Sequence, residues 1–480
     1  MRRVYLDNNA TTAVSPAVRR VMVDVLRAHN GNPSSRYRDG RDAASIMESS
    51  RRAVASAVGA LPDELIFTGS ASEANNQILL SCVANATGDR RTIVASPIEH
   101  PSVATTLKHL ESTGTPVRYC PVDRHGRVTL DALQPLVDDT TLLVSVGLAN
   151  NEIGVIQDVP AIADVAHRRG AWMMSDCVQA LGKLSVDLKA LDVDYASFSA
   201  HKIHGPKGAG VAYVRTGLPI ASLIHGGHQE NSLRAGTESL HNIAGFGEAC
   251  RHVPEMLADT PRVAALRDAL VEGIIGILPT ASLNSTTGAS TLCNTVNVTL
   301  PGFDAAEAIG FLDYNGVAVS AGSACNAKSK QPSEVLKAIG LTDEQAGQTL
   351  RLTLGSDTRR ADIDYTLGVL KRYIDGGVQP VTAISPSSLR DMLADGAVVV
   401  VDIRRPSERK MIASVPGAFE TSKTELHKGL DLPHALQIVV VCQVGFDAAI
   451  AAYALRSQGY RRVSYLNGGA VAWAAIRGGR

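Results

Sequence analysis

Aromatic residues, cysteines and excess charge of either sign are scarce in this sequence of 480 residues. Aromatic residues make up only 4%, which disfavours the stacking surfaces that bind single-stranded nucleic acid. Lys and Arg number 47, as do Asp and Glu, so the chain lacks the basic excess typical of proteins that bind nucleic acid or anionic membranes. The seven cysteines include no Cys-x-x-Cys pair, which argues against a disulfide framework and against a zinc knuckle.

Long apolar runs are also missing. The longest, such as residues 398–403, are far shorter than the roughly 18 residues that a membrane-spanning helix needs. Arginines near the N-terminus are followed by no apolar stretch, so we expect neither a secretory signal nor a membrane anchor, and a cytoplasmic location. With 45% hydrophobic residues and 20% charged residues, the composition is that of a globular protein with a large core.

Alternating strand and helix patterns predict an α/β fold. Ser15 and Pro16 fit the cap and the first residue of a helix. Short runs rich in β-branched residues then alternate with amphipathic segments, and the predicted strands are residues 65–68, 92–95, 141–146, 171–174, 195–198 and 211–214. This alternation predicts a mostly parallel sheet with helices on both faces.

The length predicts two or three domains, since single domains usually have about 100–200 residues. We expect a large domain at residues 1–252 and a smaller α+β lobe at 253–374, where the alternation becomes less regular; the N-terminal segment is a candidate to pack with this lobe. Gly, Pro and Ser between residues 375 and 386 predict a linker. Residues 387–480 restart an α/β pattern and predict a small independent domain.

Two polar residues at strand ends are candidates for cofactor chemistry. Lys202 closely follows a predicted strand, where it can lie over a ligand crevice as a Schiff-base lysine, although a solvated loop lysine is the simpler alternative. Asp176 ends another strand and can pair with a protonated pyridine nitrogen, or can merely cap the next helix. Residues 68–73 turn from a strand into a helix, which suits a phosphate group.

Motifs spread over residues 3–370 resemble those of the cysteine desulfurases. They are YLDNNATT at 5–12, GNPSS at 31–35, EANN at 73–76, EHP at 99–101, NNEIGVIQD at 150–158, SDCVQALGK at 175–183, SFSAHKIHGPKGAG at 197–210, RAGTE at 234–238 and SAGSACNAKS at 320–329. The resemblance implies a pyridoxal 5′-phosphate enzyme of fold type I, with a large mostly parallel-sheet domain and a smaller α+β lobe. It also implies a homodimer whose active sites lie near the subunit boundary.

The resemblance assigns a role to each matching residue. Lys202 would form the Schiff base and remove the α-proton of the substrate. The other implied roles are Asp176 at the pyridine nitrogen, Gln179 near the ring hydroxyl, His100 on the ring face, Ala71, Ser72, Ser199 and His201 at the phosphate, Thr237 at the phosphate of the neighbouring subunit, and Asn151 and Arg351 at the substrate carboxylate. A carboxylate suits Arg351 because guanidinium forms two parallel hydrogen bonds with it.

Cys325 would distinguish a desulfurase from other enzymes with this cofactor. It lies in a small, polar segment unlike core sequence, and such loops often carry function. The resemblance implies that its thiolate takes sulfur from L-cysteine as a persulfide and that L-alanine is released. The alternative enzymes are a selenocysteine lyase and a cysteine sulfinate desulfinase. Cys82, Cys120, Cys177, Cys250 and Cys293 lie in apolar or strand contexts and are interpreted as structural.

The tail resembles a single rhodanese domain over about residues 383–480. The matching stretches are VVVVDIRRPSE at 398–408, VPGAF at 415–419, VVVCQVGFDAA at 439–449 and LNGGAVAW at 466–473. Cys442 falls between a predicted strand and a helix, an arrangement that lowers a thiol pKa, whereas Asp447 in the same loop opposes this and disfavours thiosulfate. We expect Cys442 to receive sulfur from Cys325 for an acceptor protein, such as an iron-sulfur scaffold, a sulfur carrier or a thiolation enzyme. The alternative is a tail that only docks a partner.

Overall fold

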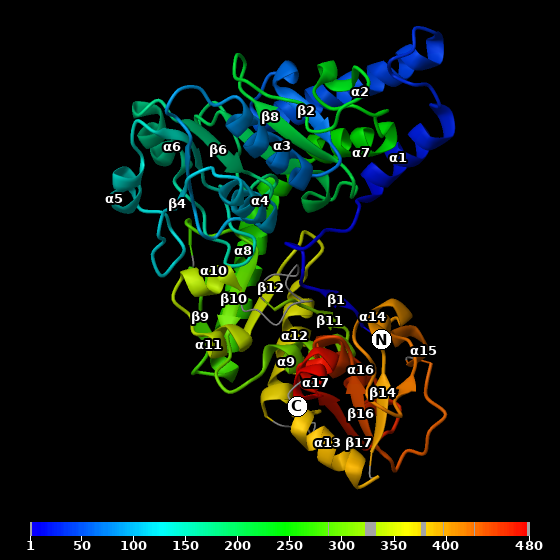
Figure 1. Ribbon diagram of the computed structural model, residues 1–480. Coiled ribbons are helices and arrows are strands. Elements are labelled where there is room, and N and C mark those ends of the chain that lie inside the picture. The colour runs from blue at the N-terminus through cyan, green and yellow to red at the C-terminus, as the bar shows by residue number, and fades with distance from the viewer. Residues whose placement is uncertain are drawn as a thin grey trace.

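The structure is a computed structural model that describes residues 2–286, 288–321, 333–375, 381–396, 398–426 and 428–477. Figure 1 shows three parts: a large domain, a smaller lobe reached through the long helix α8 (Val253–Ile277), and a tail domain beside that lobe. Within the described ranges, no helix is long and apolar enough to cross a membrane.

The large domain is built on a seven-stranded sheet. Its order is β2-β8-β7-β6-β5-β3-β4, and only β8 runs antiparallel to its neighbours. The strands are β2 (Leu65–Thr68), β3 (Thr92–Ala95), β4 (Val117–Tyr119), β5 (Thr141–Ser145), β6 (Trp172–Asp176), β7 (Tyr195–Ser199) and β8 (Gly210–Val214). The sequence prediction of a mostly parallel sheet is therefore confirmed.

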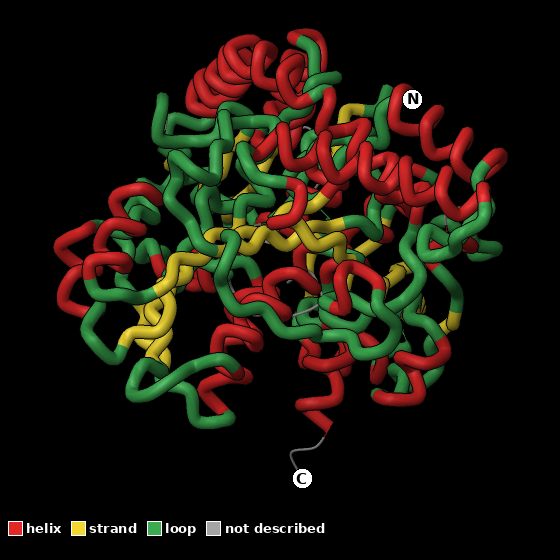
Figure 2. The backbone as a smooth tube through the Cα atoms, turned by 90° about the horizontal axis from the view of Figure 1, so that it is seen from above, coloured by secondary structure: helices red, strands yellow, loops and turns green. Residues whose placement is uncertain are grey.

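Helices cover both faces of this sheet, which Figure 2 shows as strands enclosed by helices. One face packs against α2, α6 and α7, and the other packs against α3 and α4. The helices of this domain are α1 (Pro16–Ala28), α2 (Arg38–Val58), α3 (Ala71–Ala84), α4 (Pro101–Ser112), α5 (Leu130–Leu133), α6 (Val159–Arg168) and α7 (Leu240–Arg251). Burial on both faces explains why the strands read as continuous apolar runs.

Hydroxyl caps fix where two of these helices begin. The Ser15 side chain accepts a hydrogen bond from Val18 N at 3.2 Å, and Pro16 is the first residue of α1, as predicted. The Ser70 side chain accepts from Glu73 N at 3.1 Å and caps α3. The predicted turn from strand to helix at residues 68–73 is confirmed.

The smaller lobe joins two distant parts of the chain. β1 (Val4–Tyr5) pairs in parallel with β11 (Val317–Ala318), so the N-terminal strand packs in this lobe. A second, antiparallel sheet has the order β12-β10-β9. The remaining elements are β9 (Ser282–Leu283), β10 (Thr295–Thr299), β12 (Thr349–Thr353), α9 (Ala305–Tyr314), α10 (Glu334–Ala338), α11 (Asp343–Gly347) and α12 (Arg360–Ile374).

The tail is a five-stranded parallel sheet with the order β13-β17-β16-β14-β15. Its elements are β13 (Thr382–Ile384), α13 (Pro386–Ala394), β14 (Val399–Asp402), α14 (Pro406–Met411), β15 (Phe419–Glu420), α15 (Lys423–Leu426), β16 (Gln437–Val441), α16 (Phe446–Ser457), β17 (Arg462–Leu466) and α17 (Gly469–Arg477). α13 and α17 pack on one face of this sheet. On the other face, α16 shares a continuous apolar core with the smaller lobe.

Candidate functional site

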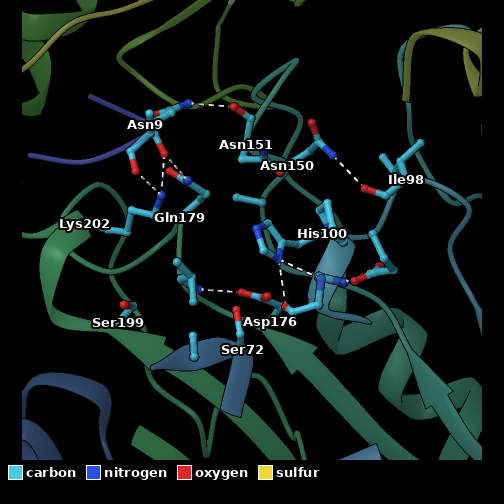
Figure 3. Close-up of a pocket in the computed structure, with 18 of the residues that line it drawn as sticks. Asn9, Ser72, Ile98, His100, Asn150, Asn151, Asp176, Gln179, Ser199 and Lys202 are labelled. Carbon is cyan, nitrogen blue, oxygen red and sulfur yellow. Dashed lines mark hydrogen bonds between the residues drawn. The ribbon is translucent and has the colours of Figure 1, made fainter. Parts of the chain in front are cut away.

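A cavity of about 290 Å³ opens near the carboxyl ends of β6 and β7, where parallel sheets usually bind ligands. Figure 3 shows side chains from both strands and from the neighbouring loops pointing into it. Ten of the residues predicted from the sequence line this cavity: Ala71, Ser72, His100, Asn151, Asp176, Gln179, Ser199, His201, Lys202 and Arg351. The fold therefore brings together residues that lie up to 280 positions apart in the sequence, from Ala71 to Arg351.

Lys202 lies directly after β7 and points toward the N-terminal segment. Its Nζ donates to the carbonyl oxygens of Asn9 and Ala10, at 2.6 and 2.8 Å. Gln179 Nε2 also donates to Asn9 O at 3.0 Å, so both side chains are held by one stretch of backbone. Figure 3 shows this cluster on one side of the cavity. The N-terminal segment thus positions the candidate Schiff-base amine.

Asp176 is held by hydrogen bonds to both of its oxygens. Val178 N donates to Oδ1 at 3.0 Å, and Asn75 Nδ2 donates to Oδ2 at 2.9 Å. The same Asn75 nitrogen donates to Ser102 Oγ at 2.9 Å. These bonds hold the carboxyl group in a fixed orientation, as the partner of a protonated pyridine nitrogen must be held.

His100 is linked to the same network. Its Nδ1 accepts from Ser102 N at 3.1 Å and lies 2.8 Å from Ser102 Oγ. Burial, with a further contribution from the charge of Lys202, holds the pKa of His100 below its usual value although Asp176 opposes the shift. The ring is therefore neutral near pH 7. Because Nδ1 accepts, Nε2 carries the proton and can donate inside the cavity.

We expect Asn75→Asp to weaken cofactor retention and alanine formation by about 10- to 100-fold, since a hydrogen bond to a charged group contributes roughly 1.5–3 kcal/mol. The new side chain cannot donate to Asp176 and adds a like charge beside it. Dialysis against buffer without cofactor, followed by absorbance, measures retention. Asn85→Asp, at the other end of α3, is the matched control. Equal retention in the two variants would contradict the expected role.

Glu99 is a second, uncharged acid at this site. It is fully buried, accepts from Gly147 N at 2.8 Å, and lies near Asp176. Burial raises the pKa of Glu99 to about 8, with the Asp176 charge adding to the shift. At neutral pH Glu99 is therefore mostly protonated and places little negative charge beside Asp176.

The opposite end of the cavity suits a phosphate group. Ala71 and Ser72 lie at the N-terminus of α3, where backbone N–H groups are free of helical partners. The end of β8 approaches this turn so closely that a Cβ on Gly210 would lie 2.3 Å from Ser70 C. His201 has its pKa lowered to about 4, mainly by burial and then by Lys202, so it is a neutral partner for phosphate.

These features together fit pyridoxal 5′-phosphate. The N-terminus of α3 can bind the phosphate, and the Asp176 carboxylate can pair with the pyridine nitrogen. The Lys202 amine can form a Schiff base with the aldehyde. The three groups line one cavity, so a single molecule can contact all of them.

Arg351 provides the cation for a substrate carboxylate. It lies on β12 with 1% of its surface exposed, donates to Asp7 Oδ1 at 2.8 Å and to Asn151 O at 3.2 Å, and lines the cavity. Its Nε has no hydrogen-bond partner among the described residues. Burial raises the pKa of Asp7, while Arg351 opposes that shift. A carboxylate entering here would meet a guanidinium with a donor to spare.

Cys325 lies outside the described residues, but Ser320 and Ser333, on either side of its segment, are attached to residues at or next to this cavity. Ser320 exchanges two backbone hydrogen bonds with Arg351, at 3.1 and 2.7 Å. Ser333 donates through Oγ to the buried Glu152 at 2.5 Å, and Glu152 immediately follows Asn151. Both attachments therefore lie beside the two residues predicted to hold the substrate carboxylate.

Thr237 does not line the cavity of its own chain. It lies exposed on a loop after β8, next to Gly236, whose N donates to Gln229 Oε1 at 3.1 Å. An exposed position is compatible with contact to a neighbouring subunit, as the resemblance implied, and its role stays a prediction.

Cys442 lies between β16 and α16 as predicted, and the two expected effects on its pKa have the predicted directions, but burial, which the sequence does not reveal, exceeds them. The thiol is 3% exposed, and its Sγ accepts from Gly445 N at 3.1 Å. Burial raises the pKa of Cys442 and outweighs the backbone N–H groups of Val444, Ala448 and Gly445, while Asp447 raises it further. The sequence does not reveal how deeply the loop buries its sulfur, and this desolvation decides the direction.

Asp447 is itself paired, with Lys423 Nζ at 2.5 Å. We expect Asp447→Asn to lower the pKa of Cys442 and to raise its alkylation rate at pH 7 only about 1.5- to 5-fold, because partly exposed charges interact weakly. Iodoacetamide labelling with peptide mapping measures the rate, and Asp395→Asn in the same domain is the control. A slower reaction in Asp447→Asn would contradict the conclusion that Asp447 raises the pKa of Cys442.

Several residues that shape the site have no role in the sequence analysis: Asp7, Asn9, Ala10, Asn75, Glu99 and Ser102. Most belong to motifs quoted above, so their presence in YLDNNATT, EANN and EHP was the available signal. Their roles depend on contacts across the fold.

In the described part of the chain, no group of three or more His, Cys, Asp or Glu residues could hold a metal ion. His225 and His228 therefore belong to no such group.

Comparison with known proteins shows that the chain contains domains of two families. The aminotransferase class-V profile matches residues 4–366, and the rhodanese-like domain profile matches residues 385–476. A cysteine desulfurase IscS of Dictyoglomus turgidum is 38% identical over 375 residues, which are 78% of this chain and 95% of the relative. A cysteine desulfurase of Sinorhizobium fredii is 40% identical over 378 residues, 78% of this chain and 97% of the relative.

Solved structures show the same likeness. A NifS-like protein superposes with a TM-score of 0.74 at 37% identity, covering 78% of this chain and all of the other. A structure described as SspA in complex with cysteine superposes with a TM-score of 0.66 at 33% identity, covering 73% of this chain and 98% of the other.

Proposed function

Because this chain belongs to the aminotransferase class-V family and ends in a rhodanese-like domain, we propose that it takes sulfur from L-cysteine at Cys325 and passes it to Cys442. The enzyme is a pyridoxal 5′-phosphate-dependent cysteine desulfurase, and L-alanine is its second product. The observation that carries the proposal is the convergence of Lys202, Asp176 and Arg351 on one cavity, with Ser320 bonded to Arg351 and Ser333 bonded to Glu152 beside Asn151.

Each residue of the cavity has a defined task in this proposal. The bound cofactor supplies an electron sink for the bonds around the α-carbon of the substrate. Arg351 holds the substrate carboxylate, and the Lys202 amine takes the α-proton, since both line the same cavity. Asp176, held by Val178 N and Asn75 Nδ2, would pair with the pyridine nitrogen of the bound cofactor. His100 carries its proton on Nε2 and can donate it inside the cavity.

Sulfur then moves in two nucleophilic displacements, and in each of them one bond forms as another breaks. The Cys325 thiolate attacks the substrate sulfur, so a sulfur–sulfur bond forms, the carbon–sulfur bond breaks, and its electron pair leaves with the carbon fragment that becomes L-alanine. The Cys442 thiolate next attacks the outer sulfur of that persulfide. The bond to Cys325 breaks, Cys325 leaves as a thiolate, and the persulfide now resides on Cys442.

The surroundings of Cys442 favour a persulfide donor over an anionic small molecule. Its sulfur is buried, backbone N–H groups surround it, and Asp447 is the acidic residue of its loop. A free anion such as thiosulfate would be repelled by this carboxylate, whereas a persulfide carried on the same chain is brought to Cys442 by the covalent connection. Fusion also raises the local concentration of donor near acceptor.

The proposal extends to the assembly and to the final acceptor. A homodimer would let the exposed Thr237 of one subunit reach the phosphate end of the neighbouring cavity. The acceptor would be a protein with a thiol that takes the sulfur from Cys442, in iron-sulfur assembly, sulfur-carrier or thiolation chemistry.

Mass spectrometry of the thiol-blocked full-length protein after incubation with L-cysteine tests the relay. We expect added sulfur on Cys325 and Cys442 in the wild type, and on neither residue in Cys325→Ser. Sulfur on Cys325 alone would leave a desulfurase whose tail docks a partner. Alanine formed without any persulfide would favour the lyase alternative, and Cys442→Ser with unchanged sulfur delivery would exclude the relay.

A further inference from the structure

Helix α16 of the tail is buried on every side. Its residues 451–455 are five consecutive positions that are each at most 8% exposed: Ala451, Ala452, Tyr453, Ala454 and Leu455. Successive helical residues are turned by about 100°, so five of them cover the whole circumference. A helix that is apolar all round needs cover on the side away from its own sheet.

Helix α9 of the smaller lobe provides this cover. It is likewise buried at five consecutive positions, residues 308–312, and the two helices contact each other and belong to one apolar core. Figure 1 shows α9 beside α16, although about 140 residues separate them in the chain. Each helix therefore completes the core of the other domain.

The contact is close and specific at Gly310. A Cβ on this residue would lie 3.0 Å from Tyr453 Cδ2 and 3.4 Å from Ile450 N, so a larger side chain would push the helices apart. Phe311 packs edge-on against Tyr453, with ring centroids 5.9 Å apart. Glycine weakens a helix interior, and its presence here is explained by this close approach.

One polar contact at the edge of the interface joins the two domains further, and a second holds Tyr453 within the tail. Tyr465 on β17 donates through its hydroxyl to Glu307 Oε1 on α9 at 3.3 Å. Val381 N donates to Tyr453 Oη at 3.5 Å, next to the start of β13. Burial raises the pKa of Glu307, which agrees with a carboxyl group enclosed between the domains.

The same helix pair connects the two sulfur-carrying segments. α9 leads through β11 to Ser320, where the segment that carries Cys325 begins, and α16 begins directly after the loop of Cys442. The smaller lobe and the tail are thus joined by two helices that lie close in sequence to the two proposed sulfur sites.

We infer that the α9–α16 contact is a built-in docking surface that holds the rhodanese-like domain on the smaller lobe, and that transfer from Cys325 to Cys442 takes place in this docked state. The partner of the surface is the chain's own second domain. The functional half of the inference rests on the proposed relay, whereas the docking itself does not.

Gly310→Leu in the full-length holoenzyme tests the inference. Gly368→Leu is the matched control, because Gly368 lies in helix α12 of the same lobe and a Cβ there meets nothing within 4 Å. We expect Gly310→Leu to speed hydrogen exchange in α16 and to slow the loading of Cys442 from labelled L-cysteine at least ~10-fold, since tethering without docking gives a lower effective concentration. Alanine formation should stay within about twofold of the wild type, and the control should match the wild type in all three measurements.

The possible outcomes separate docking from relay. Unchanged exchange in α16 of Gly310→Leu would overturn the docking surface, and faster exchange with normal loading of Cys442 would overturn the need for docking in transfer. If wild-type Cys442 never loads, the relay and the inferred need for docking both fail, while the exchange data still decide whether the surface exists. If Gly310→Leu loses alanine formation through misfolding, the milder Gly310→Ala replaces it, with smaller changes expected in the same directions.

Discussion

Lys202→Ala should lower the rate of alanine formation from L-cysteine by about 10²- to 10⁴-fold. A positioned proton acceptor contributes this much to catalysis, and the covalent attachment of the cofactor is lost as well. In the structure, Lys202 Nζ is held by the carbonyl oxygens of Asn9 and Ala10 at the carboxyl end of β7. Alanine release under saturating cofactor measures the rate, and absorbance after gel filtration measures cofactor retention.

The control for this result is Lys207→Ala. Lys207 is exposed and lies five residues further along the same loop region, outside the cavity. It should leave both the rate and the retention of cofactor near the wild-type values. If Lys202→Ala kept more than about a tenth of the wild-type rate, the role assigned to its amine would be wrong.

Arg351→Met is expected to damage substrate binding and folding together. The side chain is 1% exposed and pairs at 2.8 Å with Asp7, whose side chain is 18% exposed, so its removal leaves a largely buried carboxylate without its cation. Breaking such a pair costs about 3–5 kcal/mol. Denaturant unfolding should report a loss of that order, and kcat/KM for L-cysteine should fall at least ~100-fold, because the substrate carboxylate loses its guanidinium.

A double variant separates the two effects. Asp7→Asn combined with Arg351→Met removes the uncompensated charge, so most of the lost stability should return while kcat/KM stays low. Arg351→Lys should keep the pair with Asp7 but bind L-cysteine more weakly than the wild type, since an ammonium group lacks the planar fork. Recovery of activity in the double variant would show that Arg351 acts only through the fold.

The local elements follow closely from the sequence. Strands β2 and β3 begin and end at the predicted residues, and α1 begins at Pro16 as its Ser-Pro start predicts. The apolar run at residues 171–174 stops short of Asp176, which was nevertheless predicted to end this strand, and β6 does continue to Asp176 because that residue pairs with Ser197 of β7. Such pairing depends on the neighbouring strand and leaves no local signal.

Contacts between distant residues could not be predicted. Asp7 and Arg351 are 344 positions apart, and Asn9 and Lys202 are 193 positions apart. Periodicity reports only which face of an element is buried, whereas these contacts depend on how the segment after β1 lies between β12 of the smaller lobe and Lys202 after β7. For the same reason, the sequence shows that Asn75 belongs to a motif but not that its side chain links Asp176 to Ser102.

By itself the sequence determined the α/β class, the order of the elements and the residue types that meet at the cavity, because strand and helix periods and strand-end motifs are local properties. The tertiary structure alone decided the quantities that depend on burial. It raised the pKa of Cys442 against the expected helix effect, left Glu99 protonated beside Asp176, and joined α9 to α16. Burial is set by what packs against a group from elsewhere in the chain, and desolvation then determines charge and contact.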